Sequence, residues 1–312
     1  MVAVGLSIFF SIKSEAFYSG DNFKNVTETM APIALVAAGM VMLLICGEID
    51  LAVGRVYALA PAIVYVVSSD ERYGLPIWVG VLAALSVSAA VGLTNGMITT
   101  FLGVPSFITT LGMLFFLNGV TLQLLEGTQV FMPGGSTFRD IFGSQPDEYF
   151  LWLNSEFFWA LGIILFLQFL LTWTRWGLHT VATGGNLIGA AEAGVSVRRI
   201  KIGNFVLANL LAGFAGILDS TRITTIVPLQ GGPDLFFIAL AGAVIGGTSL
   251  FGGSGSIIGA FIGVAVLVIL RTGFSIIGVS AFTFELIIGI AIIVAMVVNV
   301  QVARLKNLGR LQ

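Results

Sequence analysis

The run YGLPIWVGVLAALSVSAAVGLTNGMITTFLGVPSFITTLGMLFFLNGVTLQLL at residues 73–125 contains no charged residue. A transmembrane helix needs about 20 consecutive apolar residues, so this run is long enough to cross a bilayer twice. Pro76 and the segment Gly103–Pro105 interrupt it, and we expect helices at roughly 77–101 and 106–125. This stretch predicts an α-helical membrane protein.

The composition of the whole chain supports the same prediction. Hydrophobic residues make up 57% of the 312 residues and charged residues 10%, and the mean hydropathy is +1.03. A soluble domain has about 25% charged residues, so lipid must be the main solvent of this chain. Because no long stretch has ordinary soluble composition, we expect residues 1–312 to form a single transmembrane domain.

The remaining apolar segments bring the predicted total to about ten spans, which defines an all-α polytopic fold. They are residues 1–12, 30–46, 51–67, 157–174 and 202–219, two helices within 235–270 divided near Gly252–Gly255, and 282–300 with Glu285 inside it. Residues 1–12 are short for a full span and lack the basic start of a signal peptide, so we expect a partial first helix. The interrupted segments 47–54 and 247–256 do not fall at matching positions in the two halves, so the sequence does not show an inverted repeat, although transporters often have one.

The basic residues predict the orientation in the membrane. Cytoplasmic loops are enriched in Lys and Arg, and the loop 175–201 and the C-terminal tail carry Arg175, Arg198, Arg199, Lys201, Arg304, Lys306 and Arg310. Segment 126–156 has one basic residue, Arg139, among several acidic ones. We therefore expect loop 175–201 and both termini in the cytoplasm, and 126–156 outside.

Three segments that interrupt or adjoin apolar runs are candidates for the functional region. They read GEIDLAVG at 47–54, VPSFITTLG at 104–112 and IGGTSLFGGSGS at 245–256. Irregular backbone at membrane depth must be buried in protein or line a cavity, because lipid offers no hydrogen bonds. We therefore expect a transport pathway near these segments.

Taken in order, the three segments closely resemble the membrane subunit of bacterial ABC importers for simple sugars, the ribose/xylose/arabinose-type permease family. The resemblance covers roughly residues 18–300. It implies a type II ABC importer-like fold with broken or re-entrant glycine-rich segments, in the bacterial cytoplasmic membrane. The first motif departs from the usual GGIDLSVG of the family, since Glu48 replaces a glycine and Ala52 a serine.

Several polar residues in and near these segments are candidates for the translocation path. They are Asp50, Asn95, Ser106, Thr109, Asn118, Thr248 and Ser249. A carboxylate at membrane depth marks a functional site by default, but Asp50 could instead cap the following helix or serve contacts between subunits. The hydroxyls could bind a sugar or bond back to their own helices, and Asn95 and Asn118 could join neighbouring helices. Whether Glu48, Asp50 and Glu285 touch the substrate stays open.

A second resemblance lies in the predicted cytoplasmic loop, TWTRWGLHTVATGGNLIGAAEAGVSV at 172–197. In ABC importers such a segment forms a short helix that docks into a groove of the ATPase subunit, where small residues allow close approach. The matching positions that we assign to ATPase coupling are Gly184, Asn186, Ala190, Ala191 and Gly194. The alternative is an amphipathic helix that lies on the membrane surface.

The chain has no GxxxxGK[ST] phosphate loop, so we expect ATP and Mg to bind a partner ATPase and this chain to be neither an enzyme nor a holder of a cofactor or metal. The resemblance implies ABC ATPase subunits, a second permease copy (identical or paralogous) and a periplasmic or lipid-anchored sugar-binding protein. Membrane lipid surrounds the chain, and no nucleic acid is expected.

Three other functions compete with import of a monosaccharide or related polyol. The same architecture could carry nucleosides or branched-chain amino acids. A gradient-driven secondary transporter would need buried ion ligands, for which Asp50 and Glu285 are thin support. An intramembrane enzyme is disfavoured because the predicted spans hold no histidine, no Ser–Lys pair and no paired-aspartate motif, and the only histidine, His179, lies in a loop. The only cysteine, Cys46, leaves no intrachain disulfide.

Overall fold

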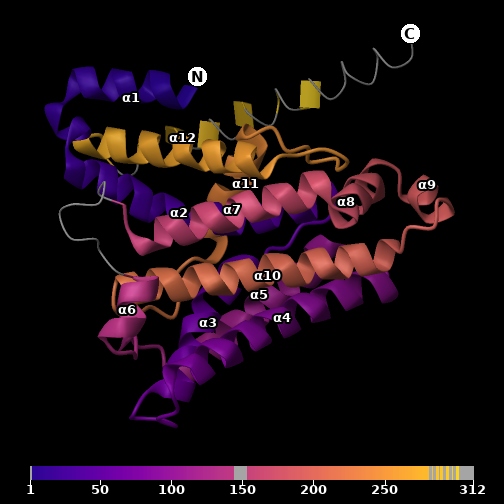
Figure 1. Ribbon diagram of the computed structural model, residues 1–312, viewed down its shortest axis with the longest axis horizontal. Helices are drawn as coiled ribbons and strands as arrows, with labels where there is room; N and C mark the ends of the chain where they lie inside the picture. Colours follow the sequence, from indigo (N-terminus) through magenta and orange to yellow (C-terminus); the bar gives the residue numbers. More distant parts are fainter. Residues whose placement is uncertain are drawn as a thin grey trace.

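The computed structural model describes residues 2–143, 153–280 and separate positions between 283 and 301, and Figure 1 shows a bundle of helices. The elements in chain order are α1 (Val2–Lys13), η1 (Glu15–Tyr18), α2 (Gly20–Ile45), α3 (Val53–Ser68), α4 (Ile77–Phe101), α5 (Ser106–Leu124), β1 (Val130–Phe131), α6 (Ser136–Phe142), α7 (Ser155–Trp173), α8 (Arg175–Gly185), α9 (Leu187–Glu192), α10 (Val197–Arg222), β2 (Thr225–Ile226), α11 (Gly232–Ile245) and α12 (Ile257–Ile276). The strands β1 and β2 form one short antiparallel pair.

The helices confirm the predicted all-α polytopic membrane fold. Six of the described helices are long and apolar enough to cross a membrane: α2, α4, α5, α7, α10 and α12. Three shorter apolar helices, α1, α3 and α11, accompany them. Each predicted span except the last therefore corresponds to one apolar helix, and Glu285 of that last span lies outside the described residues.

Two central helices extend beyond their predicted ends. Helix α2 begins at Gly20 rather than near residue 30, and α10 runs over Val197–Arg222 rather than 202–219. The predicted spans leave out Glu28 and Arg222, but these residues are paired with each other inside the protein, Glu28 within α2 and Arg222 as the last residue of α10. These extensions bring charged side chains into the bundle.

Helices α2 and α10 form the centre of the bundle and run antiparallel. Glu28 of α2 lies beside Arg222 of α10, whereas Met42 near the other end of α2 accepts a hydrogen bond from Asn204 of α10. Glycine allows the close approach, because a Cβ atom at Gly39 would lie 2.8 Å from the Cα atom of Ala208. Nearly every α2 side chain beyond Met30 is buried, so α2 is shielded from lipid.

Each of these two 26-residue helices is followed by a break and a shorter helix. We call residues 46–52, between α2 and α3, the first break, and residues 223–231, between α10 and α11, the second break. The first turns of α3 and α11 touch, since a Cβ atom at Gly54 would lie only 2.1 Å from the carbonyl oxygen of Gly232. The antiparallel helix–break–helix units have the arrangement of an inverted repeat.

This pairing corrects the sequence-based comparison of the two halves. The counterpart of the first break is 223–231, which contains no charged residue, and not the glycine-rich segment 247–256. Residues 246–256 instead connect α11 to α12. Since the second break has no ionisable residue or glycine cluster, its sequence alone did not distinguish it from an ordinary connection.

Candidate functional site

The first break is held by one buried carboxylate. Asp50 is completely buried and its two oxygen atoms accept hydrogen bonds from the Ala52 N–H at 2.8 Å, Asn209 Nδ2 at 2.7 Å and Asn95 Nδ2 at 3.3 Å. The N-cap position of α3 is Ala52 itself and α3 has no side-chain cap, so Asp50 holds the turn that leads into α3 and does not cap its first turn. Asn95 belongs to α4 and Asn209 to α10, so Asp50 also joins these helices to the break.

Hydroxyl groups of α5 satisfy the backbone of the first break. The Leu51 N–H donates to Thr110 Oγ1 at 3.1 Å, and the Ile49 N–H donates to Ser106 Oγ at 3.3 Å. Such pairing is what permits irregular backbone inside a membrane protein. The structure thus brings the predicted residues Asp50, Asn95 and Ser106 together around the first break.

Two other predicted path residues on α5 have unused acceptors. Among the described residues, neither Thr109 Oγ1 nor Asn118 Oδ1 has a hydrogen-bond partner, and both atoms are buried. An unsatisfied buried polar group usually has a specific explanation, such as a water or a ligand that binds there. Thr109 and Asn118 are therefore the α5 side chains whose polar atoms are available to another molecule.

The predicted residues Thr248 and Ser249 belong to a different place, the connection between α11 and α12. Thr248 is buried, and Ser249 organises its own loop by accepting a hydrogen bond from the Phe251 N–H at 3.2 Å. Gly253 N–H donates to the carbonyl oxygen of Ile45 at 2.8 Å. This loop therefore packs against the end of α2.

The predicted coupling segment folds into α8 and α9. Asn186 caps α9 by accepting a hydrogen bond from the Gly189 N–H at 3.0 Å, and Ala190 is buried. Ala191 and Gly194 are exposed, as is the apolar side chain of Ile188. Figure 1 shows α9 at one end of the long axis of the molecule and α6 at the other.

Gly184 has a different environment from the other coupling candidates. A Cβ atom there would lie 1.7 Å from the carbonyl oxygen of Ile45 and 2.8 Å from the Gly253 nitrogen. Glycine is required because the end of α8 is packed against the end of α2 and the 246–256 connection. Helix α8, which leads into α9, is therefore in direct contact with the end of α2, next to the first break, and with the 246–256 connection.

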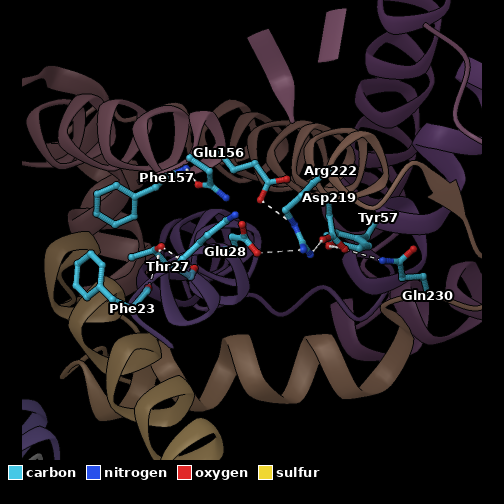
Figure 2. Close-up of polar contacts among 11 residues, drawn as sticks. Phe23, Thr27, Glu28, Tyr57, Glu156, Phe157, Asp219, Arg222 and Gln230 are labelled. Carbon is cyan, nitrogen blue, oxygen red and sulfur yellow. Dashed lines mark hydrogen bonds and ion pairs between the residues drawn. The ribbon is translucent and has the colours of Figure 1, made fainter. Parts of the chain in front are cut away.

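Sequence reasoning missed a buried ionic cluster at the opposite end of α10. Figure 2 shows Arg222 between three buried carboxylates, with Asp219 at 2.6 Å, Glu156 at 3.3 Å and Glu28 at 3.6 Å. The Tyr57 hydroxyl and Gln230 Nε2 each donate to Asp219 Oδ2 at 2.6 Å. We call these six residues the Arg222 cluster.

The members of the Arg222 cluster come from separate elements. Glu28 lies on α2, Tyr57 on α3, Glu156 on α7, Gln230 in the second break, and the other two on α10. The available sequence signal was the Asp219–Arg222 spacing of three residues, which places both side chains on one face of a helix. Glu156 had been assigned to an external loop, but α7 begins at Ser155 and buries it.

Comparison with known proteins identifies the family. Residues 22–296 match the family described as the permease component of the branched-chain amino acid transport system. The chain belongs to this permease family. No solved structure shows a significant match to it.

Curated relatives match along nearly the whole chain. The chain is 37% identical to the xylose/arabinose import permease protein XylH of Sulfolobus acidocaldarius, over 96% of this chain and 83% of the relative. It is 34% identical to the ribose import permease protein RbsC of Escherichia coli K12, over 93% and 88%. The autoinducer 2 import system permease protein LsrC of Photorhabdus luminescens is 30% identical, over 92% and 84%. The predicted resemblance to sugar import permeases is confirmed.

Proposed function

We propose that the chain is the transmembrane subunit of an ATP-binding-cassette importer and forms the translocation path for a monosaccharide or related polyol. The observation that carries this proposal is the near full-length similarity to permeases named for xylose/arabinose and ribose import. Residues 1–312 act as one transmembrane domain in the cytoplasmic membrane, with both termini in the cytoplasm. The chain itself catalyses no reaction.

Separate ATPase subunits supply the energy in this proposal. The sequence has no phosphate loop, so ATP and Mg bind the partner. Helix α9 supports an ATPase contact, because it exposes Ile188, Ala191 and the turn at Gly194 at one end of the molecule. Small residues at this surface would let the wall of a groove on the ATPase approach the backbone of α9 closely.

The candidate path residues on α4, on α5 and in the first break divide into two groups, apart from Thr248 and Ser249 in the connection between α11 and α12. Asp50, Asn95 and Ser106 shape the first break, because their polar atoms bond to it or to one another. Thr109 and Asn118 offer buried acceptor atoms without partners among the described residues and make no bond to the first break, whereas Asn95, whose Oδ1 also has no partner there, bonds to Asp50 through Nδ2. We therefore assign contact with sugar hydroxyls to Thr109 and Asn118 and a positioning role to the first group.

A second permease copy and a sugar-binding protein complete the importer. Helices α4 and α5 leave large apolar side chains exposed, among them Phe107, Phe115 and Phe116, and these faces suit lipid and a second copy of the chain or a paralogue. The binding protein, periplasmic or lipid-anchored, would deliver the sugar at the end that carries α6.

Reconstitution in liposomes tests this function. The permease with its ATPase and binding protein should accumulate xylose, arabinose or ribose when ATP is supplied, whereas the permease alone should not. Uptake driven by a proton or sodium gradient without the ATPase would contradict the proposal.

The second candidate cargo is a branched-chain amino acid, which the family description favours. The same liposomes should be tested with leucine and with a nucleoside. ATP-driven accumulation of leucine and not of any sugar would establish this alternative and leave the importer mechanism in place.

A further inference from the structure

Helix α10 reaches from the coupling segment to the Arg222 cluster. It begins at Val197, a few residues after α9, and its 26 residues end at Arg222. At a rise of 1.5 Å per residue this helix is about 39 Å long, which matches the thickness of a bilayer. One rigid element thus connects the two ends of the molecule.

The first turns of α10 are bonded to the coupling segment. Asn204 Oδ1 accepts a hydrogen bond from Trp176 Nε1 at 2.9 Å, and Asn204 Nδ2 donates to Thr180 Oγ1 at 3.2 Å. Trp176 and Thr180 both lie on α8, and Asn204 is fully buried. A displacement of α8 and α9 would therefore act directly on α10.

On either side of Asn204, α10 bonds to the first break. Lys201 forms an ion pair with Glu48, and Asn209 donates to Asp50 at 2.7 Å. Glycine at 216 then lets α10 lie directly on α3, where a Cβ atom would come within 1.9 Å of the Tyr57 carbonyl oxygen. The first break and its half-helix α3 are therefore fixed to α10.

At its far end α10 bonds to the second break. Asp219 accepts hydrogen bonds from both Tyr57, on α3, and Gln230, immediately before α11. The Asp219 carboxylate thereby bonds to α3 and to the residue just before α11. Arg222 also forms ion pairs with Glu28 of α2 and Glu156 of α7. Removing the only guanidinium of this cluster would leave three buried carboxylates without their cation, a change that strongly disfavours the present arrangement.

We propose that α10 transmits movement of the coupling segment to both breaks, and that the Asp219–Arg222 pair is the positioning contact at its far end. This inference rests on the proposed function, since the movement originates at the ATPase. When the pair is lost, the ATPase still acts on α8 and α9, but Arg222 no longer holds the Asp219 carboxylate in the position where it bonds to Gln230 and Tyr57, so the second break no longer follows α10. ATP hydrolysis then continues with little transport.

The first test measures sugar uptake and ATP hydrolysis together in liposomes that hold the complete importer. Arg222→Gln and Asp219→Asn should reduce the sugar taken up per ATP by about tenfold, a typical size for coupling between sites, while the ATPase remains bound. Arg222→Lys should restore part of the ratio because it keeps the charge. The matched control is Arg72→Gln, which removes an exposed ion pair with Glu126 and should leave the ratio unchanged.

The second test follows the second break itself. Leu229→Cys, placed in a Cys46→Ala background, reports access to an exposed position beside Gln230. A non-hydrolysable ATP analogue should change its labelling rate in the complete importer, and Arg222→Gln should abolish that change. A purely structural role of Arg222 would lower protein yield without removing the nucleotide response.

The outcomes separate this inference from the proposed function. No ATP-driven uptake by the unaltered importer would overturn the function, whereas uptake with normal coupling in Arg222→Gln would overturn the inference. If Arg222→Gln does not fold, Tyr57→Phe replaces it, because it removes only the hydroxyl that donates to Asp219. Tyr57→Phe should then lower the uptake per ATP, and an unchanged ratio would overturn the inference.

Discussion

At the scale of single residues, neighbouring hydroxyls on α5 have different roles. Thr110 accepts a hydrogen bond from the backbone of the first break, whereas Thr109 Oγ1 has no partner within the part of the chain that the structure describes. Both side chains are buried on the same turn of the same helix. Thr110 therefore supports the break, whereas Thr109 is free for the sugar contact that we propose.

We expect Thr110→Val to destabilise the permease and Thr109→Val to leave its stability unchanged. Valine has nearly the shape of threonine, but at position 110 it leaves the Leu51 N–H unpaired, which costs about 1–3 kcal/mol. Thermal unfolding in detergent should show a lower Tm for Thr110→Val alone. In the uptake assay Thr109→Val should raise KM for the sugar. Equal stability losses in both variants would contradict the assignment.

Gly184 provides a second test at this scale, because its hydrogen atom faces a carbonyl group. Gly184→Ala should reduce both stability and uptake, since the added Cβ would lie 1.7 Å from the Ile45 oxygen. Gly162→Ala on α7 is the control, because no atom lies within 4 Å of a Cβ there, and alanine favours a helix by about 1 kcal/mol over glycine. A neutral Gly184→Ala variant would show that α8 does not pack on α2 as described.

At the scale of elements, the short helix α9 is separated from the bundle and presents apolar atoms to its surroundings. Ile188 is 71% exposed and Ala191 is exposed beside it. Gly194 differs, because its φ of +82° is a conformation that side chains other than glycine rarely adopt. A substitution at Gly194 would therefore strain the backbone in addition to any effect on a partner.

Ala191→Trp should abolish co-purification of the ATPase and ATP-driven uptake. The bulky side chain fills the space that a groove wall would occupy, while membrane insertion and the Tm of the isolated permease stay unchanged because position 191 is exposed. Phe166→Trp on the exposed face of α7 is the control. Retention of the ATPase by Ala191→Trp would show that the coupling surface lies elsewhere.

At the scale of the whole molecule, the two ends differ in charge and in the elements that form them. The α8–α9 end carries the basic residues of 175–201, and the opposite end carries α6 and the Arg222 cluster (Figure 1). From the charge rule we expect the first end to face the cytoplasm. The expected orientation therefore depends on how the basic residues are distributed between the two ends of the whole bundle.

Thiol labelling of intact cells should reveal this orientation. In a Cys46→Ala background, Asp140→Cys on α6 should react with an impermeant reagent and Arg198→Cys on α10 should not, because both positions are exposed but lie at opposite ends. Permeabilised cells, in which both positions should react, provide the control. The reverse pattern in intact cells would invert the topology and remove the basis for placing the ATPase at α9.

The sequence by itself determined the membrane class, the approximate spans and the positions of three interruptions. These three features follow from local composition. A helix that crosses lipid needs a long apolar run, and a polar or glycine-rich segment that interrupts such a run is easily recognised. It also placed Asp50, Asn95 and Ser106 among the functional candidates, since polar groups inside apolar runs are conspicuous.

Only the tertiary structure decided which of these groups meet and which helices they join. Asn209 lies 159 residues after Asp50, and Gln230 lies 11 residues after Asp219 across a chain reversal, so neither contact follows from local pattern. Glu28 and Arg222 fell outside the predicted spans 30–46 and 202–219, and Glu156 fell in the predicted external segment 126–156, because an unpaired charge is unfavourable in a span. Antiparallel packing places Arg222, at the end of α10, beside Glu28 inside α2, and α7 brings Glu156 to the same guanidinium, so these charges are paired inside the protein.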